Sequence, residues 1–98
     1  MIDSYKFDAI IIGAGIVGLA VARRLCKNFD SILLVEKEES FGRHVSSRNS
    51  EVIHCGIYYP QNGLKAKLCM KGNKMLVDFA RKNFVHLINC GKLVVISK

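Results

Sequence analysis

Three closely spaced glycines constrain this chain more than any other feature of its sequence. Gly13, Gly15 and Gly18 follow Ala9–Ile12, a short apolar run rich in β-branched residues that is typical of a buried parallel strand. Residues 16–28 keep a helical spacing of apolar side chains, so the glycines stand where a strand turns into a helix. There Gly13 permits a tight turn, Gly15 leaves the backbone open to close approach, and Gly18 lets the helix pack closely on the strands.

A second buried strand is predicted over residues 31–35. Strand, helix and strand within about thirty residues form a βαβ unit, in which the two strands are parallel. The predicted fold class is therefore α/β: the N-terminal βαβ part of a Rossmann-like FAD/NAD(P)-binding fold, incomplete. Further along, residues 64–83 return to helical spacing, and residues 92–96 are a last candidate strand.

The helix that follows the glycines favours an anionic ligand at its start. Its unpaired N–H groups and partial positive charge attract a pyrophosphate. Glu36, directly after the second strand, is placed to hydrogen-bond the ribose 2′-hydroxyl of an adenosine and to repel a 2′-phosphate, which disfavours NADP. The alternative is a turn that binds nothing, and the unit alone does not separate FAD from NAD. The residues predicted to bind the cofactor here are Gly13, Ala14, Gly15, Ile16, Val17, Gly18, Glu36 and Lys37.

Composition excludes several classes of protein. The chain has 98 residues, of which 50% are hydrophobic and 23% charged, so we expect one small globular domain rather than disorder. The net charge of +7 is scattered along the sequence, which does not favour nucleic acid as a partner. The four cysteines form no CxxC pair, and no metal site is predicted. Without a recognisable signal peptide or membrane-spanning run, we expect a cytoplasmic protein, or one peripheral at the inner membrane.

A long loop carries the most specific signal. Glycine, serine and asparagine mark residues 40–63 as loop, and long loops in compact domains are often functional. Within it, Gly42-Arg-His-Val-Ser-Ser-Arg-Asn-Ser-Glu-Val-Ile-His-Cys-Gly-Ile-Tyr-Tyr-Pro60 resembles the second motif of the D-amino acid oxidase-like FAD superfamily. The most similar family is that of the L-2-hydroxyglutarate dehydrogenases (oxidases), which Leu64-Lys65-Ala66 and Cys90-Gly91-Lys92-Leu93 also match. The sequence departs from the pattern of this family at Val45, where Gln is common, and at Ser47, where Gly is common.

This resemblance implies a two-domain flavoenzyme. Such an enzyme binds FAD, oxidises a small L-2-hydroxy acid to the 2-keto acid, and passes the electrons to a quinone or to oxygen. On this basis residues 1–39 are the dinucleotide-binding unit of an FAD-binding domain, 40–63 the flavin-facing loop, and 64–98 a helix and the start of a substrate-domain strand. We expect residues 1–98 to be an N-terminal fragment, inactive alone, with a complementing C-terminal polypeptide as a candidate partner.

The resemblance also assigns roles within the loop. It implies that the loop runs along the flavin, with cofactor-binding side chains at Arg43, His44, Ser46, Ser47, Arg48 and Asn49. A solvated polar loop is the alternative. His54 is the candidate catalytic residue, because imidazole titrates near neutrality and can act as a base or orient the flavin; a packed structural histidine is the alternative. Two other functions stay open for the chain: a nucleotide-binding module without a redox role, and a non-functional remnant of a truncated gene.

Overall fold

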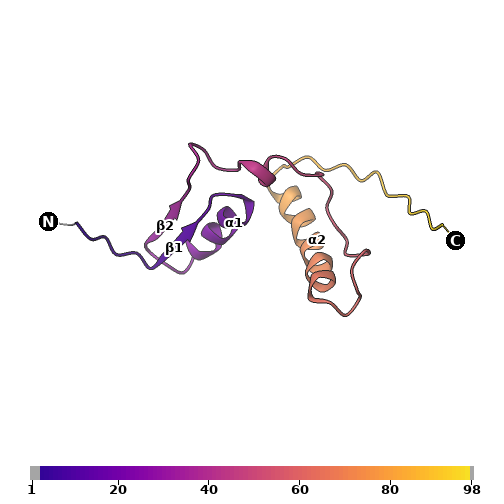
Figure 1. Cartoon of the computed structure of the whole chain (residues 1–98), viewed down its shortest axis with the longest axis horizontal. Coiled ribbons are helices and arrows are strands. Elements are labelled where there is room, and N and C mark those ends of the chain that lie inside the picture. The colour runs from indigo at the N-terminus through magenta and orange to yellow at the C-terminus, as the bar shows by residue number, and fades with distance from the viewer. Residues whose placement is uncertain (1–2, 98) are drawn as a thin grey trace. The chain divides into compact units, whose positions relative to one another are not determined.

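The computed structural model describes residues 3–97 and divides into two compact units (Figure 1). The first unit, Met1–Ser50, contains the strands β1 (Ala9–Ile12) and β2 (Ile32–Val35) and the helix α1 (Ile16–Leu25). It also contains one turn of 3₁₀ helix, His44–Ser46. The second unit, Glu51–Lys98, contains the long helix α2 (Leu64–Lys82).

The first unit is the βαβ arrangement that the sequence predicts. β1 and β2 are hydrogen-bonded in parallel, with Ala9 opposite Ile32 and Ile12 opposite Val35. A parallel pair needs a crossover connection, and α1 supplies it (Figure 1). The α/β fold class is confirmed, as a small two-stranded version of a Rossmann-like unit.

One carboxylate fixes where the two strands begin. The side chain of Asp8 accepts hydrogen bonds from the backbone N–H groups of Asp30, at 3.2 Å, and Ser31, at 2.9 Å. The N–H of Asp8 in turn donates to the carbonyl oxygen of Ser31 at 2.9 Å. The loop that leads into β2 is therefore tied to the residue that precedes β1, which sets the register of the pair.

Helix α1 packs close to the strands because of a glycine. A Cβ added to Gly18 would overlap the carbonyl oxygen of Gly13 and lie 3.6 Å from the Cγ2 of Ile11, so no side chain fits at this position. Ile11 is half-buried, whereas Ile12, the next residue, is 88% exposed. The predicted packing role of Gly18 is confirmed, and β1 has apolar side chains left in solvent.

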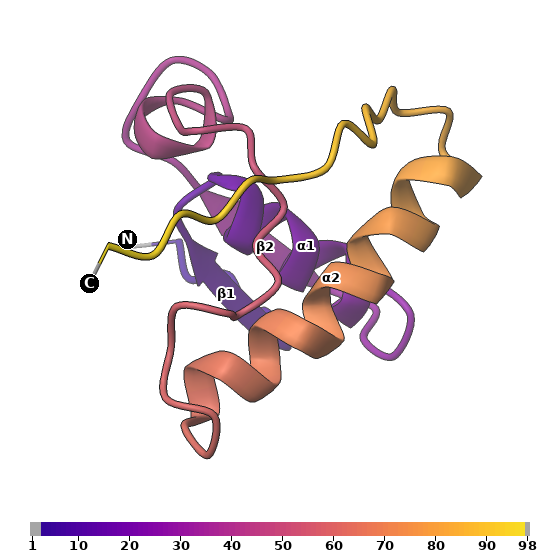
Figure 2. The same ribbon diagram turned by 90° about the vertical axis from the view of Figure 1, so that its right-hand side faces the viewer.

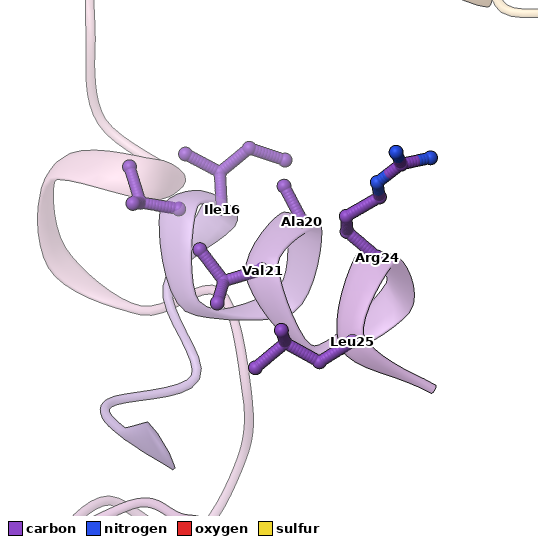
Figure 3. Close-up of a pocket in the computed structure, with 6 residues that line it drawn as sticks. Ile16, Ala20, Val21, Arg24 and Leu25 are labelled. Atoms are coloured by element: carbon purple, nitrogen blue, oxygen red, sulfur yellow. The ribbon is translucent and has the colours of Figure 1, made fainter. Parts of the chain in front are cut away.

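The apolar face of α1 is also open to solvent. A shallow hollow of about 420 Å³ lies on this face and is lined by Ile16, Val17, Ala20, Val21, Arg24 and Leu25. Figure 3 shows the lining side chains along the helix. Within residues 3–97 the buried residues are three alanines: Ala14, Ala66 and Ala80. Neither unit therefore contains a closed core of large apolar side chains, which is where most folding free energy comes from.

The observed ends of α1 and β2 differ slightly from the predicted ones. α1 ends at Leu25, three residues before the predicted end at Asn28, because the N–H of Asn28 turns back to the carbonyl oxygen of Leu25 at 2.8 Å. Such tightened last turns are common at helix C-termini. β2 begins at Ile32, one residue later than predicted, since Ser31 is held by the carboxylate of Asp8.

Helix α2 begins at the predicted residue, Leu64, and runs unbroken to Lys82 (Figure 2). A Cβ at Gly72, in its middle, would have no atom within 4 Å, so this glycine weakens the helix only through its propensity. Asn83 ends the helix, and its side-chain amide donates to the carbonyl oxygen of Phe79 at 2.7 Å. Neither α-helix in the part of the chain that the structure describes combines the length and apolar character needed to cross a membrane.

The strand predicted at residues 92–96 is not formed. Residues 85–97 contain neither helix nor strand, and they extend away from α2 in Figure 1. A strand is stabilised by a ladder of hydrogen bonds to a neighbour, and in residues 3–97 the sheet consists of β1 and β2 alone. The segment does contain a continuous apolar run, Leu93 to Ile96, but no strand of residues 3–97 pairs with it.

Candidate nucleotide-binding site

The glycine turn lies at the carboxyl ends of the two strands. The N–H of Gly13 donates to the carbonyl oxygen of Val35 at 2.7 Å, which extends the ladder by one bond beyond β1. Gly13 has a φ of 103°, a conformation that is strained for a residue with a side chain. The carboxyl end of a parallel sheet, where a turn leads into a helix, is the usual ligand position in such folds.

The start of α1 presents N–H groups beside this turn. Gly15 is the residue before the helix and has no side chain to cap it. The first helical bond runs from the N–H of Leu19 to the carbonyl oxygen of Gly15, at 3.0 Å. The N–H groups of Ile16, Val17 and Gly18 therefore belong to the first turn, which has no acidic side chain, and they favour an anion there.

Glu36 binds the turn itself. Its Oε2 accepts a hydrogen bond from the N–H of Ala14 at 2.7 Å, and its Oε1 accepts one from the N–H of Glu38 at 3.0 Å. The N–H groups of Glu38 and Ala14 stabilise the charged carboxylate and lower its pKa below the ordinary value. The sequence predicts a ribose partner at Glu36. The structure adds a second role, since the same carboxylate holds the glycine turn against the end of β2.

Part of the predicted cofactor loop lies directly on the glycine turn. The N–H of Gly42 donates to the carbonyl oxygen of Ala14 at 2.8 Å, and the Oγ of Ser46 accepts from the N–H of Ile16 at 2.9 Å. Segments about thirty residues apart are thereby brought together, as the prediction of one shared binding site requires. Nothing in the sequence signals the bond between Ser46 and Ile16, because its partner is a backbone group.

A hydrogen bond between two side chains and a local network shape the rest of the loop. His44 adopts a φ of 55°, which is uncommon for a residue other than glycine, and its Nε2 lies 2.9 Å from the Oε1 of Glu38. The side-chain amide of Asn49 donates to the carbonyl oxygens of Val45, at 3.0 Å, and Ser46, at 3.3 Å. Asn49 therefore supports the turn.

A hollow of about 430 Å³ lies beside this loop. It is lined by Glu38, Glu39, Arg43, His44, Ser47 and Arg48.

Lys37 is a predicted cofactor-binding residue, whereas its neighbour Glu38 is not predicted from the sequence. Lys37, predicted to bind the cofactor, has a side chain that is 80% exposed, and its Nζ lies 3.8 Å from the Oε1 of Glu38. Glu38 was not predicted as a site residue. Its carboxylate contacts both Lys37 and His44, so it links the end of β2 to the loop. Its only sequence signal was membership of the charged run after the strand.

His54 belongs to the second unit. Its residue is exposed in the part of the chain that the structure describes. Its carbonyl oxygen accepts a hydrogen bond from the side-chain amide of Asn73 at 3.3 Å, which joins the loop to α2. The catalytic role of His54 and the alternative of a packed structural histidine both stay predictions.

The chain is similar to known proteins over nearly all of its length. A family described as FAD dependent oxidoreductase matches residues 8–98. Proteins named "L-2-hydroxyglutarate dehydrogenase, mitochondrial" are 49% identical in Dictyostelium discoideum, over 94% of this chain and 21% of the relative. The Arabidopsis thaliana protein of that name is 47% identical, over 92% of this chain and 19% of the relative. The human protein of that name is 44% identical, over 92% of this chain and 20% of the relative.

These matches confirm the resemblance found in the sequence. The chain spans about a fifth of the length of the relatives it matches. The matched region includes the glycine turn, Glu36 and the loop that closes on them. On this agreement between the geometry of the first unit and the family match, the chain belongs to the FAD-dependent oxidoreductases.

Proposed function

We propose that this chain binds FAD through its first unit, as part of an oxidoreductase that converts a small L-2-hydroxy acid to the 2-keto acid. The observation that carries the proposal is the glycine turn at the start of α1, held by Glu36 in a chain of this family. The substrate class comes from the relatives, whose names specify L-2-hydroxyglutarate.

The residues of the first unit fit the adenosine-diphosphate half of FAD. The space left by the missing side chain of Gly15 holds no other atom within 4 Å than the Oγ of Ser46, so the backbone is open to a phosphate there. The first-turn N–H groups of α1 favour its negative charge. Each carboxylate oxygen has about two acceptor positions, so Glu36 can bind Ala14 and still accept from a ribose hydroxyl.

The chemistry divides between cofactor and chain. Bound FAD supplies the acceptor for the hydride that leaves C2 of the hydroxy acid, and a quinone or oxygen is the proposed final acceptor. The chain's own residues bind and orient. We assign the loop side chains Arg43, His44, Ser46, Ser47, Arg48 and Asn49 to the flavin side, with Lys37 beside them. His54 is the proposed base for the proton of the 2-hydroxyl.

The exposed apolar faces support a complementing polypeptide as partner. Ile12 of β1 and the outer face of α1 are in solvent, and the chain spans about a fifth of its relatives' length. We propose that these faces are covered by a second polypeptide, which corresponds to the rest of those relatives. The expected cytoplasmic location is not confirmed, because the relatives carry mitochondrial names.

The visible absorption spectrum of the purified chain, with and without added FAD, tests this function. We expect bound flavin that remains with the chain through gel filtration. Binding of ADP without retention of FAD would instead favour a nucleotide-binding module with no redox role. A chain that binds neither ligand would be a remnant without function, and the proposal would fail.

A further inference from the structure

The hydroxyl of Ser46 occupies the place where a phosphate oxygen is expected. It accepts a hydrogen bond from the N–H of Ile16, the first residue of α1, at 2.9 Å. An N–H group has one hydrogen and makes one strong hydrogen bond, so this donor does not serve Ser46 and a phosphate at full strength together.

The space above Gly15 contains the same hydroxyl. A Cβ at Gly15 would lie 3.0 Å from the Oγ of Ser46, and among residues 3–97, apart from the neighbours of Gly15 in the chain, no other atom lies within 4 Å of it. The glycine leaves the backbone open for a ligand, and the Ser46 hydroxyl lies in that opening. The Ile16 N–H and the opening above Gly15 are therefore the place where the Ser46 hydroxyl lies and where a pyrophosphate would bind.

Two further contacts hold the short segment that carries Ser46. The carbonyl oxygen of Ala14 accepts from Gly42 at 2.8 Å, and the imidazole of His44 contacts Glu38 at 2.9 Å. His44 holds a left-handed backbone conformation that residues other than glycine adopt reluctantly. Ser46 itself is half-buried, and its bond to Ile16, together with the bond of Gly42 to Ala14, holds the segment over the turn without a packed core beneath it.

We propose that Ser46 is a detachable cap on the phosphate site. In the ligand-free chain its hydroxyl holds the Ile16 N–H, and the pyrophosphate of the cofactor replaces it there. The released hydroxyl then takes its proposed place on the flavin side, a role that ADP, which has no flavin, does not engage. This inference rests on the proposed function, and it concerns how the site is kept closed. Nucleotide binding then requires the segment around His44–Ser46 to move off the turn, and the cap lowers the apparent affinity.

The test is calorimetric titration of the full chain with ADP, in the parent and in Ser46→Ala. Removing the cap should tighten ADP binding about two- to tenfold, the net worth of one hydrogen bond. Ser46→Thr keeps a hydroxyl and should bind like the parent. Ser40→Ala is a matched control, since the Ser40 hydroxyl donates to the neighbouring carbonyl oxygen of Phe41, at 3.5 Å.

Amide hydrogen exchange of the ligand-free proteins gives a readout that needs no ligand. The Ile16 amide should exchange faster in Ser46→Ala than in the parent and in Ser46→Thr, because its acceptor is gone. Weaker or equal ADP binding by Ser46→Ala would overturn the cap and make Ser46 an ordinary ligand contact. Failure of the parent itself to bind ADP would instead remove the proposed function, and the inference with it.

Discussion

The irregular segments of the two units are held in different ways. In the first unit, the loop after β2 is fastened to the glycine turn by Gly42 and Ser46, each within hydrogen-bonding distance of a backbone group. In the second unit, the segment after α2 leaves Phe84 98% exposed and Ile96 88% exposed. Its Lys92 lies 4.7 Å above the ring of Tyr58, an exposed contact of modest strength. The loop after β2 is therefore held by hydrogen bonds to both a carbonyl and an N–H group of the turn, whereas the segment after α2 leaves large apolar side chains in solvent.

This contrast has a functional meaning. The first unit contains the predicted pieces of a nucleotide site, including the turn, the helix start and Glu36. The second unit offers His54 and an apolar segment without a strand partner among residues 3–97. We therefore expect this chain to bind a nucleotide better than it transforms a substrate.

The largest expected effect concerns catalysis. Holding a substrate in place against the flavin accounts for about 7–11 kcal/mol of barrier lowering, and the chain spans about a fifth of the relatives that perform the reaction. The purified chain should show no turnover of L-2-hydroxyglutarate with an artificial electron acceptor while it still binds nucleotide. Steady turnover, in a preparation free of longer homologues, would show that residues 1–98 are catalytically sufficient.

The next largest effect concerns Gly15. In Gly15→Val, a branched side chain fills the opening in which the Ser46 hydroxyl now lies 3.0 Å from the position of a Cβ. ADP binding should fall below detection in calorimetry, with nearly unchanged far-ultraviolet circular dichroism. Gly72→Ala in α2, where a Cβ meets nothing within 4 Å, is the control and should bind like the parent. Normal ADP binding by Gly15→Val would move the phosphate site away from this turn.

A smaller effect is expected for Glu36. Glu36→Ala removes both the proposed ribose acceptor and the acceptor for the Ala14 N–H, so FAD and ADP binding should weaken about tenfold or more. The parent should also prefer NAD to NADP. Asp78→Ala, in α2, removes the same charge far along the sequence and should leave affinity unchanged. If Glu36→Ala and the parent have equal affinity, the ribose assignment is wrong.

The smallest effect is a pH dependence confined to the first unit. Because the N–H groups of Glu38 and Ala14 lower the pKa of Glu36, its contribution to stability is complete above the ordinary carboxyl pKa. It is lost as the pH falls through the lowered pKa. A carbon-detected NMR titration of the Glu36 carboxyl should show the low pKa, with the Ala14 amide shift following it. Glu36→Gln should abolish that amide titration. A carboxyl pKa at or above the ordinary value would contradict the observed bonds.

The sequence predicts most of the first unit because its signals are local. β1 and the start of α1 are predicted at their observed positions, since a β-branched run and a glycine turn define them within a few residues. The capping bond of Ser46 and the His44–Glu38 pair escaped prediction, because each joins a side chain to a group whose position depends on the folded turn. The strand predicted at 92–96 failed for a related reason, since pairing depends on a partner that periodicity does not reveal.

The central claim is that the first unit alone forms the phosphate-binding part of the site, and hydrogen exchange with and without ADP tests it most directly. Since the buried residues of 3–97 are three alanines, the amides of Ala9–Ile12 and Ile32–Val35 should be weakly protected in the ligand-free monomer. ADP at a hundred times its Kd should slow their exchange about a hundredfold, with smaller changes in α2. Unchanged exchange in both strands on adding ADP, or strong protection before it is added, would contradict this account.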